Sequence, residues 1–98
     1  MFLAEVDARP AGYCLIFIRR LPPISRVNKL GHIADFLVLK EFRGQGISSK
    51  LKNEAMQWFR QKGIKHVSLN VLEKNRVPQS IYKKWGFFPY VVEMRKNL

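Results

Sequence analysis

The sequence lacks the features that define several large classes of protein. Its single cysteine, Cys14, excludes a disulfide within the chain, and its two histidines, His32 and His66, stand apart from each other, so we predict no metal site. No apolar run approaches the ~20 residues of a membrane span. The first residues carry no basic start of a secretory signal. These absences predict a cytoplasmic protein with no membrane partner.

Acidic residues are also scarce. Eighteen Lys and Arg face seven Asp and Glu, which gives a formal net charge of +11 over 98 residues. Such a charge attracts polyanions, so nucleic acid and a phosphorylated cofactor both remain candidate partners. The basic residues are spread along the chain, with no run longer than Arg19-Arg20 or Lys83-Lys84. With no linker or repeat in so short a chain, we predict one domain over residues 1–98.

Hydrophobic periodicity predicts a mixed α/β (α+β) domain. Alternating or continuous apolar residues indicate strands, and apolar residues at helical spacing after position 46 indicate a helix that ends at Gly63. The second helix is short, begins at an Asn75 cap and ends at Gly86. The predicted strands are Phe2–Val6, Ala11–Ile18, Ile33–Leu39, His66–Leu72 and a last extended segment, Phe87–Arg95.

A glycine-containing loop, RGQGIS, separates the third strand from the long helix. Glycine lets a backbone approach a ligand closely, and the first amides of a helix can bind an anion such as a pyrophosphate. Ser49 could add a hydroxyl donor. Neither the spacing of a nucleoside-triphosphatase loop nor that of a dinucleotide fingerprint is present. The loop alone fits a phosphate site and a plain strand-to-helix turn equally well.

A second group of residues, Asn75, Tyr82 and Gly86-Phe87, lies on and around the short helix. The Asn75 side chain can cap the helix or bind an amide of a ligand. Tyr82 can be a half-buried amphipathic residue or a proton donor to a leaving group.

Together the two groups resemble the motifs of the GNAT superfamily of acyl-CoA N-acyltransferases. The family pattern Arg/Gln-x-x-Gly-x-Gly/Ala is similar to Arg43–Ser48, with Ser48 in place of the last Gly or Ala; Asn75, Tyr82, Gly86 and Phe87 resemble the second pattern. The resemblance implies a GNAT-like mixed, mostly antiparallel sheet with helices on both faces, here without the usual N-terminal strand and helices. A homodimer in which a partner closes the site is a further expectation.

The resemblance also implies a function: an acetyl-CoA-dependent N-acetyltransferase whose acceptor, a small-molecule or protein primary amine, attacks the acetyl group directly. Tyr82 would be the general acid. The basic loop from Arg19 to His32 would face the acceptor, which indicates an anionic substrate. The residues that would bind the cofactor are the main chain of Leu37, Val38 and Leu39 for pantetheine; Arg43, Gly44, Gln45, Gly46, Ile47, Ser48 and Ser49 for pyrophosphate; and Asn75, Tyr82 and Lys84.

Asp35 is the candidate general base, acting through water. The family often has a Glu-Asp pair at this place, whereas this chain has Ala34-Asp35, and we favour a structural role for the remaining acid. Two alternative functions stay open: a CoA-binding module or sensor without turnover, and association with nucleic acid through the positive charge.

Overall fold

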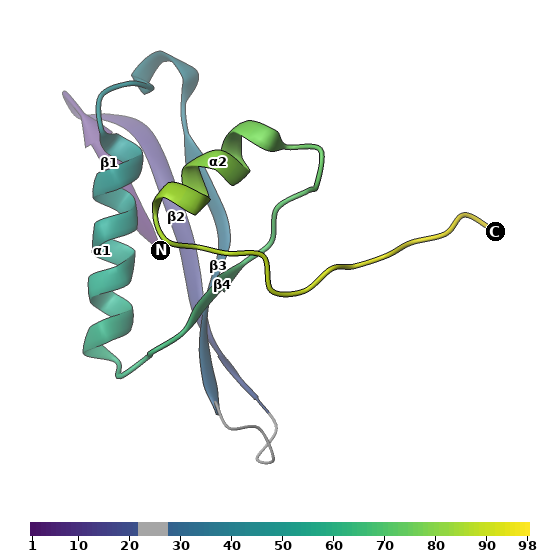
Figure 1. The fold of residues 1–98 in the computed structure, drawn as a ribbon. Coiled ribbons are helices and arrows are strands. Elements are labelled where there is room, and N and C mark those ends of the chain that lie inside the picture. Colours follow the sequence, from purple (N-terminus) through teal and green to yellow (C-terminus); the bar gives the residue numbers. More distant parts are fainter. Residues whose placement is uncertain (22–27) are drawn as a thin grey trace.

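Strands and helices follow the predicted order as far as the second helix. The computed structural model describes residues 1–21 and 28–98 (Figure 1). The elements are β1 (Phe2–Val6), β2 (Arg9–Arg20), β3 (Lys29–Val38), the short 3-10 helix η1 (Lys40–Phe42), α1 (Ile47–Gln61), β4 (Val67–Leu69) and α2 (Arg76–Lys84). In this part of the chain no helix is long and apolar enough to cross a membrane.

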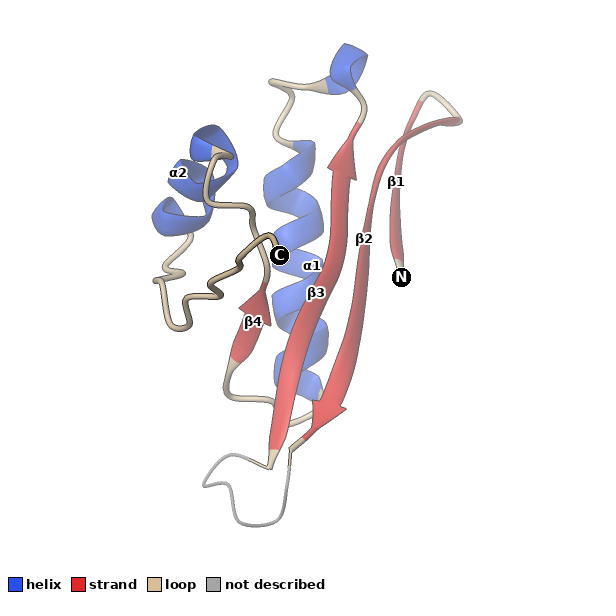
Figure 2. Cartoon of the chain, turned by 90° about the vertical axis from the view of Figure 1, so that its right-hand side faces the viewer, coloured by secondary structure: helices blue, strands red, loops and turns tan. Residues whose placement is uncertain are grey.

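The strands form one sheet in the order β1-β2-β3-β4 (Figure 2). The first three run antiparallel, and β4 lies parallel to β3. Asp7 and Ala8, with φ of 51° and 64°, make the two-residue turn between β1 and β2, and such a turn matches the twist of a hairpin. The predicted mixed, mostly antiparallel sheet is therefore confirmed.

The core lies between the sheet and α1. Leu51, Ala55 and Phe59, spaced four residues apart, form the buried stripe of α1 and pack against Cys14 and other apolar residues of β2 and β3. At Gly31 an added Cβ would lie 2.7 Å from the Phe59 ring. Glycine at that position of β3 therefore allows α1 to approach the sheet closely.

Both helices lie on the same face of the sheet. The indole of Trp85, at the end of α2, lies 5.7 Å from the Phe36 ring of β3, measured between centroids. The ammonium of Lys52, on α1, lies 5.5 Å from the Trp85 ring centroid. The arrangement thus differs from the predicted helices on both faces. On the other face, Leu3, Leu15 and Phe17 are exposed.

The predicted last strand, Phe87–Arg95, does not form. After α2 the chain runs in an extended path away from the sheet and pairs with no described strand (Figures 1 and 2). A strand exists only when a neighbour supplies its hydrogen bonds, so the local apolar pattern was insufficient. The predicted strand His66–Leu72 is likewise shorter, since only Val67–Leu69 pair with β3.

Only the two ends of the basic loop predicted between Arg19 and His32 are described. Its ends belong to β2 and β3, which pair through Arg20 and Lys29, and residues 22–27 lie outside the described residues. This hairpin end and the glycine loop lie at opposite ends of β3 (Figure 1).

Candidate active site

The glycine loop turns the chain into α1. Gly46 occupies the N-cap with φ of 76°, a left-handed conformation that favours glycine, and α1 begins at Ile47. The first turn of α1 contains no acidic residue, and no side chain caps it. The first amides of a helix have no intrahelical acceptor, and the helix dipole makes this end partly positive. The N-terminus of α1 can therefore bind an anion.

Arg43 ties the loop to the sheet. Its Nε donates to the Val38 carbonyl oxygen at 3.1 Å, so the side chain turns back along the end of β3. This contact links the loop that precedes α1 to the end of β3. The sequence predicted Arg43 only as a phosphate contact through its amide.

A cavity of about 520 Å³ lies between the end of β3, the glycine loop and α2. It brings the two sequence motifs together, because Gly46 and Tyr82 both line it. Phe36, Pro78 and Trp85 also line it and were not among the predicted site residues. The predicted residues that line it are Leu37, Val38, Arg43, Gly44, Gly46, Ile47, Ser48 and Tyr82; Asp35, Leu39, Gln45, Ser49, Asn75 and Lys84 are not part of its described lining.

Strands β3 and β4 separate beside this cavity. Their pairing stops at Ile33 and Leu69, whereas β3 continues to Val38. The Leu39 amide donates to the Ala11 carbonyl oxygen at 2.8 Å, toward β2. Because backbone groups alternate in direction along a strand, those of Leu37 also face β2, and those of Phe36 and Val38 face the gap.

The backbone groups in the gap are partly engaged already. The Phe36 amide donates to Asp35 Oδ1 at 2.9 Å, and the Val38 carbonyl accepts from Arg43. This leaves the Phe36 carbonyl and the Val38 amide to face the gap. Phe36 was not among the predicted site residues. The direction in which its backbone groups point follows from the pairing register of β3 with β2, which the sequence does not reveal.

The second motif is the cap of α2. Gly86, with φ of 93°, follows the helix; its amide donates to the Lys83 carbonyl at 3.0 Å, and the Phe87 amide donates to the Tyr82 carbonyl at 3.0 Å. These two bonds define a Schellman motif. The Phe87 and Tyr82 rings meet edge to face, with centroids 6.3 Å apart. The Tyr-x-x-x-Gly-Phe pattern therefore fixes the position of the tyrosine ring.

The Tyr82 phenol is held in its neutral form. Burial is the main cause that raises its pKa above the ordinary value, and negative charge at Cys14 and Asp35 adds to the effect. A neutral phenol that lines a cavity can donate a proton there.

Asp35 lies on the exposed face of the sheet. Its Oδ2 accepts from the Tyr13 hydroxyl at 2.5 Å, and its Oδ1 accepts from the Phe36 amide. The hydrogen bond to Asp35 is the main cause that raises the pKa of Tyr13. Both carboxylate oxygens thus have protein donors, as the favoured structural role requires. The sequence alone could not assign Tyr13 as the partner of Asp35.

Asn75 stands at the N-cap of α2, but its side chain makes no capping hydrogen bond, which differs from the predicted cap. Gln79 holds this turn instead, since its Nε2 donates to the carbonyls of Leu72 at 2.9 Å and Glu73 at 2.7 Å. Lys84 is exposed in the last turn of α2, where a cation is favoured by the helix dipole.

Comparison with known proteins shows the family of this chain. The model of the acetyltransferase (GNAT) family matches residues 1–87, and the chain belongs to that family. A Bacillus subtilis protein, provisionally assigned as an N-acetyltransferase for the alanine of ribosomal protein bS18, is 32% identical over 93 residues, 95% of this chain and 55% of its own length. An N-alpha-acetyltransferase of Sulfurisphaera tokodaii is 31% identical over 88% of this chain and 54% of its own length.

The solved structures agree on the fold. A GCN5-related N-acetyltransferase from Ralstonia eutropha is 26% identical with a TM-score of 0.81, over 98% of this chain and 62% of that one. The aminoglycoside N-acetyltransferase AAC(6')-Iy, solved in complex with CoA, is 21% identical with a TM-score of 0.81, over 98% of this chain and 74% of that one. The chain spans about half the length of the two curated relatives.

Proposed function

We propose that this chain binds acetyl-CoA and transfers its acetyl group to a primary amine. The observation that carries the proposal is the shared cavity, which joins an uncapped helix N-terminus, an open strand edge and the phenol of Tyr82. The CoA complex of a protein with the same fold supports the choice of cofactor.

The cavity offers a separate contact for each part of the cofactor. The amides that begin α1, from Ile47 to Ser49, would bind the pyrophosphate through hydrogen bonds and the helix dipole. The pantetheine arm would run along the open edge of β3, donating to the Phe36 carbonyl and accepting from the Val38 amide. The expected contact of pantetheine was with the main chain of Leu37, Val38 and Leu39. The proposed contact is with Phe36 and Val38 instead, because the backbone groups of Leu37 face β2.

Acetyl transfer then needs one proton donor at the sulfur. The amine nitrogen attacks the thioester carbonyl carbon, the C–S bond breaks, and the leaving thiolate takes the Tyr82 hydroxyl proton. The amine nitrogen gives its extra proton to solvent, because Asp35 is occupied by Tyr13 and Phe36 and does not line the cavity. The Tyr82 phenolate regains a proton from solvent, which restores the phenol for the next cycle.

Two glycines provide a matched test of cofactor binding. Gly46 and Gly63 have φ of 76° and 74° and open space around an added Cβ, but they lie at opposite ends of α1. Alanine at either costs roughly 1–2 kcal/mol of backbone strain. By isothermal titration, Gly46→Ala should weaken acetyl-CoA binding about tenfold or more, and Gly63→Ala should leave it unchanged. Failure of the folded wild type to bind acetyl-CoA would refute the proposal.

Tyr82→Phe tests the chemistry. With a panel of primary amines and a thiol-release assay, this variant should bind acetyl-CoA normally but lose roughly 10²-fold or more in rate. Tyr90→Phe is the control, because Tyr90 is exposed beyond α2.

A second candidate function is CoA binding without turnover. Two observations favour it: both carboxylate oxygens of Asp35 already accept hydrogen bonds, and no carboxylate is part of the described cavity lining. Normal acetyl-CoA binding by wild type and Tyr82→Phe, with no acetylation of any amine by either, would select this function.

A further inference from the structure

Four parts of the chain meet at the end of the sheet that lies away from the glycine loop. They are the last residues of β2, the first residues of β3, the end of α1 and the segment that leads into β4 (Figure 2). The Gly31 amide donates to the His66 carbonyl at 2.9 Å, and an added Cβ at Gly31 would meet the Phe59 ring. These contacts hold the hairpin end, the start of β4 and the last turn of α1 together.

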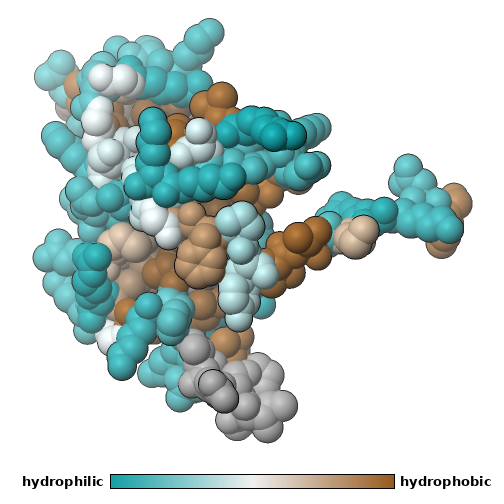
Figure 3. All heavy atoms as spheres, viewed as in Figure 1, coloured by the Kyte–Doolittle hydropathy of each residue, from teal (hydrophilic) through white to brown (hydrophobic). Residues whose placement is uncertain are grey.

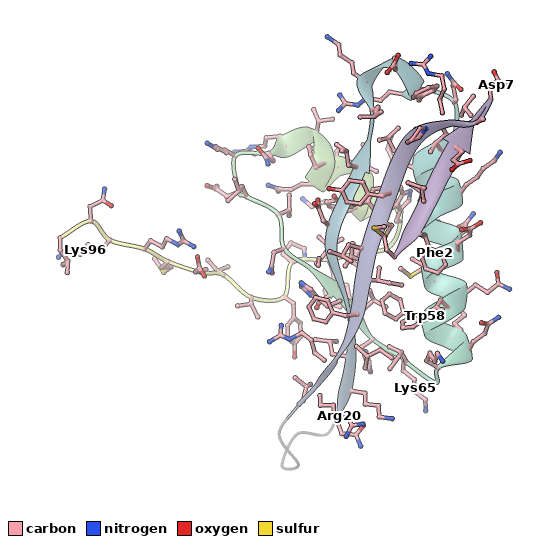
Figure 4. All side chains as sticks on the ribbon, turned by 180° about the vertical axis from the view of Figure 1, so that it is seen from behind. Phe2, Asp7, Arg20, Trp58, Lys65 and Lys96 are labelled. Atoms are coloured by element: carbon pink, nitrogen blue, oxygen red, sulfur yellow. The ribbon has the colours of Figure 1, made fainter. Side chains whose placement is uncertain are left out.

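Positive charge gathers where these parts meet. Six exposed cationic side chains define this surface, which we call the basic end: Arg19 and Arg20 of β2, Lys29 of β3, Arg60 in the last turn of α1, and Lys62 and Lys65 between α1 and β4. Figure 4 shows Arg20 and Lys65 at the same end of the molecule, opposite Asp7. Figure 3 shows mostly hydrophilic residues along the outer side of α1.

No acidic residue balances this charge locally. The two stretches that build the basic end, residues 16–34 and 55–72, contain no Asp or Glu, although the chain has seven acidic residues. Glu5 and Asp7 lie at the other end of the sheet, and so does Glu41, which pairs with Arg9 at 3.2 Å. The net charge of +11 is therefore not spread evenly over the molecule.

Two cations of the basic end are held in an unfavourable arrangement. Arg20 and Lys29 are direct cross-strand partners in the pairing of β2 with β3. Like charges directly opposite each other destabilise a sheet. Within residues 1–21 and 28–98, neither side chain forms an ion pair with an acid. An anion bound at this pair would relieve the repulsion, so the arrangement favours a binding role.

The aromatic side chain beside these cations indicates which kind of polyanion fits. The half-buried Trp58 ring meets the Phe59 ring edge to face, with centroids 5.4 Å apart, and the Lys62 ammonium lies 5.7 Å from the Trp58 centroid. Trp58 is thus engaged in packing. Sites for single strands stack bases on exposed aromatic rings, whereas the backbone of a duplex is bound through charge. The basic end supplies charge, which favours a duplex.

We propose that the basic end binds the phosphate backbone of a nucleic-acid duplex without reading its sequence. The glycine loop lies at the opposite end of β3 (Figure 1). The ten residues of this strand, at about 3.3 Å each, place roughly 30 Å between the two surfaces. A bound duplex would therefore leave the cavity with Tyr82 open. The proposal does not depend on acetyl transfer.

Fluorescence anisotropy with short labelled RNA and DNA duplexes of the same sequence tests the proposal. We expect the logarithm of the binding constant to fall with the logarithm of salt concentration with a slope of about −4 to −5 for the DNA duplex, since each of roughly five neutralised phosphates contributes about 0.9. Arg20→Gln/Lys29→Gln should weaken binding about tenfold or more at low salt and reduce the slope by about 2.

Lys40→Gln/Lys74→Gln is the matched control. It removes the same net charge from two exposed residues outside the basic end, and it should change the affinity less than about twofold, because the field of exposed charges is screened within about 10 Å at 0.1 M salt. Arg20→Gln/Lys29→Gln should melt at or slightly above the wild-type temperature, since it removes the cross-strand repulsion. Weaker binding by this variant then cannot come from unfolding.

Binding of either duplex with this pattern supports the proposal, and the comparison of RNA with DNA identifies the preferred backbone. Equal losses in the two double variants would mean that net charge alone binds, which overturns it. Tighter binding to a single strand, or to a glutamate-rich peptide of equal charge, also overturns it, and so does no binding at low salt. Excess acetyl-CoA should not release the duplex. Competition would place the duplex at the glycine loop and refute a separate surface.

Discussion

Neighbouring residues of β2 lie in opposite environments on the two faces of the sheet. Cys14 and Ile16 are buried beneath α1, with exposed fractions of 0% and 8%, whereas Leu15 and Phe17 are 42% and 44% exposed. All four are apolar, so the strand sequence itself does not distinguish the faces. The distinction comes from α1, whose stripe of Leu51, Ala55 and Phe59 packs on one side only.

The same division separates the polar groups of the candidate site. The phenol of Tyr82 reaches its cavity on the face covered by the helices, and the Tyr13–Asp35 pair lies on the exposed face. The covered face therefore combines the core with the proposed cofactor site. The exposed face carries apolar side chains and a hydrogen-bonded acid that the proposed chemistry does not use.

The largest difference between the faces should appear in stability. Leu51→Ala opens a cavity in the covered face and should lower the free energy of unfolding by about 2–5 kcal/mol. Leu15→Ala removes a partly exposed side chain and should change it by about 0.5 kcal/mol at most. Urea denaturation followed by circular dichroism measures both. Equal losses would show that the exposed face is covered in solution.

The rate at which a cysteine thiol is alkylated should also differ between the two faces, and this effect is smaller than the effect on stability. Burial raises the pKa of Cys14 from 9.0 to about 11, so less thiolate is present at neutral pH. This shift lowers the thiolate fraction roughly 100-fold. A thiol placed on the exposed face by Leu15→Cys, in a Cys14→Ala background, should react with iodoacetamide about 100-fold faster than Cys14. Mass spectrometry measures both rates, and comparable rates would contradict the burial of Cys14.

Replacing Gly31 should lower the stability of the fold by an intermediate amount. An alanine Cβ there would approach the Phe59 ring to 2.7 Å, so the ring or α1 must shift. We expect Gly31→Ala to destabilise the fold by about 1–3 kcal/mol. Ala34→Ser, at an exposed position of the same strand, is the matched control and should be near neutral. If Gly31→Ala melted at the wild-type temperature, α1 would not pack as closely as described.

Local signals predicted much of this molecule. The stripe of α1, the end of α2 at Gly86 and the glycine loop each depend on residues close in sequence. The family resemblance predicted that the glycine loop and the group around Tyr82 belong to one site. Gly46 and Tyr82 do line the same cavity.

Features set by strand register could not be predicted. An irregularity in the pairing of β2 and β3 between Leu15 and Ile16 skips Ala34 and brings Asp35 opposite Leu15, within reach of Tyr13. The direction of the Phe36 backbone depends on the same register. The last predicted strand failed because its partner is not encoded in its own residues.

The smallest effect that we expect concerns the Tyr13–Asp35 pair. The hydrogen bond to Asp35 raises the pKa of Tyr13 above its ordinary value of 10.0, because loss of the phenol proton breaks that bond and places two negative charges together. The folded pKa exceeds the unfolded one, so the pair stabilises the fold fully below about pH 10 and loses this contribution as the pH rises through the folded pKa.

The absorbance of phenolate, taken as the difference between wild type and Tyr13→Phe, measures this titration without interference from Tyr82 or Tyr90. Asp35→Asn should return the Tyr13 transition toward 10.0, since the amide carries no charge and accepts a weaker hydrogen bond. Tyr13→Phe should lower the urea midpoint slightly at about pH 8 and less at about pH 11. An unchanged Tyr13 transition in Asp35→Asn would mean that the pair does not persist in solution. Asp35 would then be free to act as a base on the exposed face, so this small measurement bears directly on how the two faces divide the proposed chemistry.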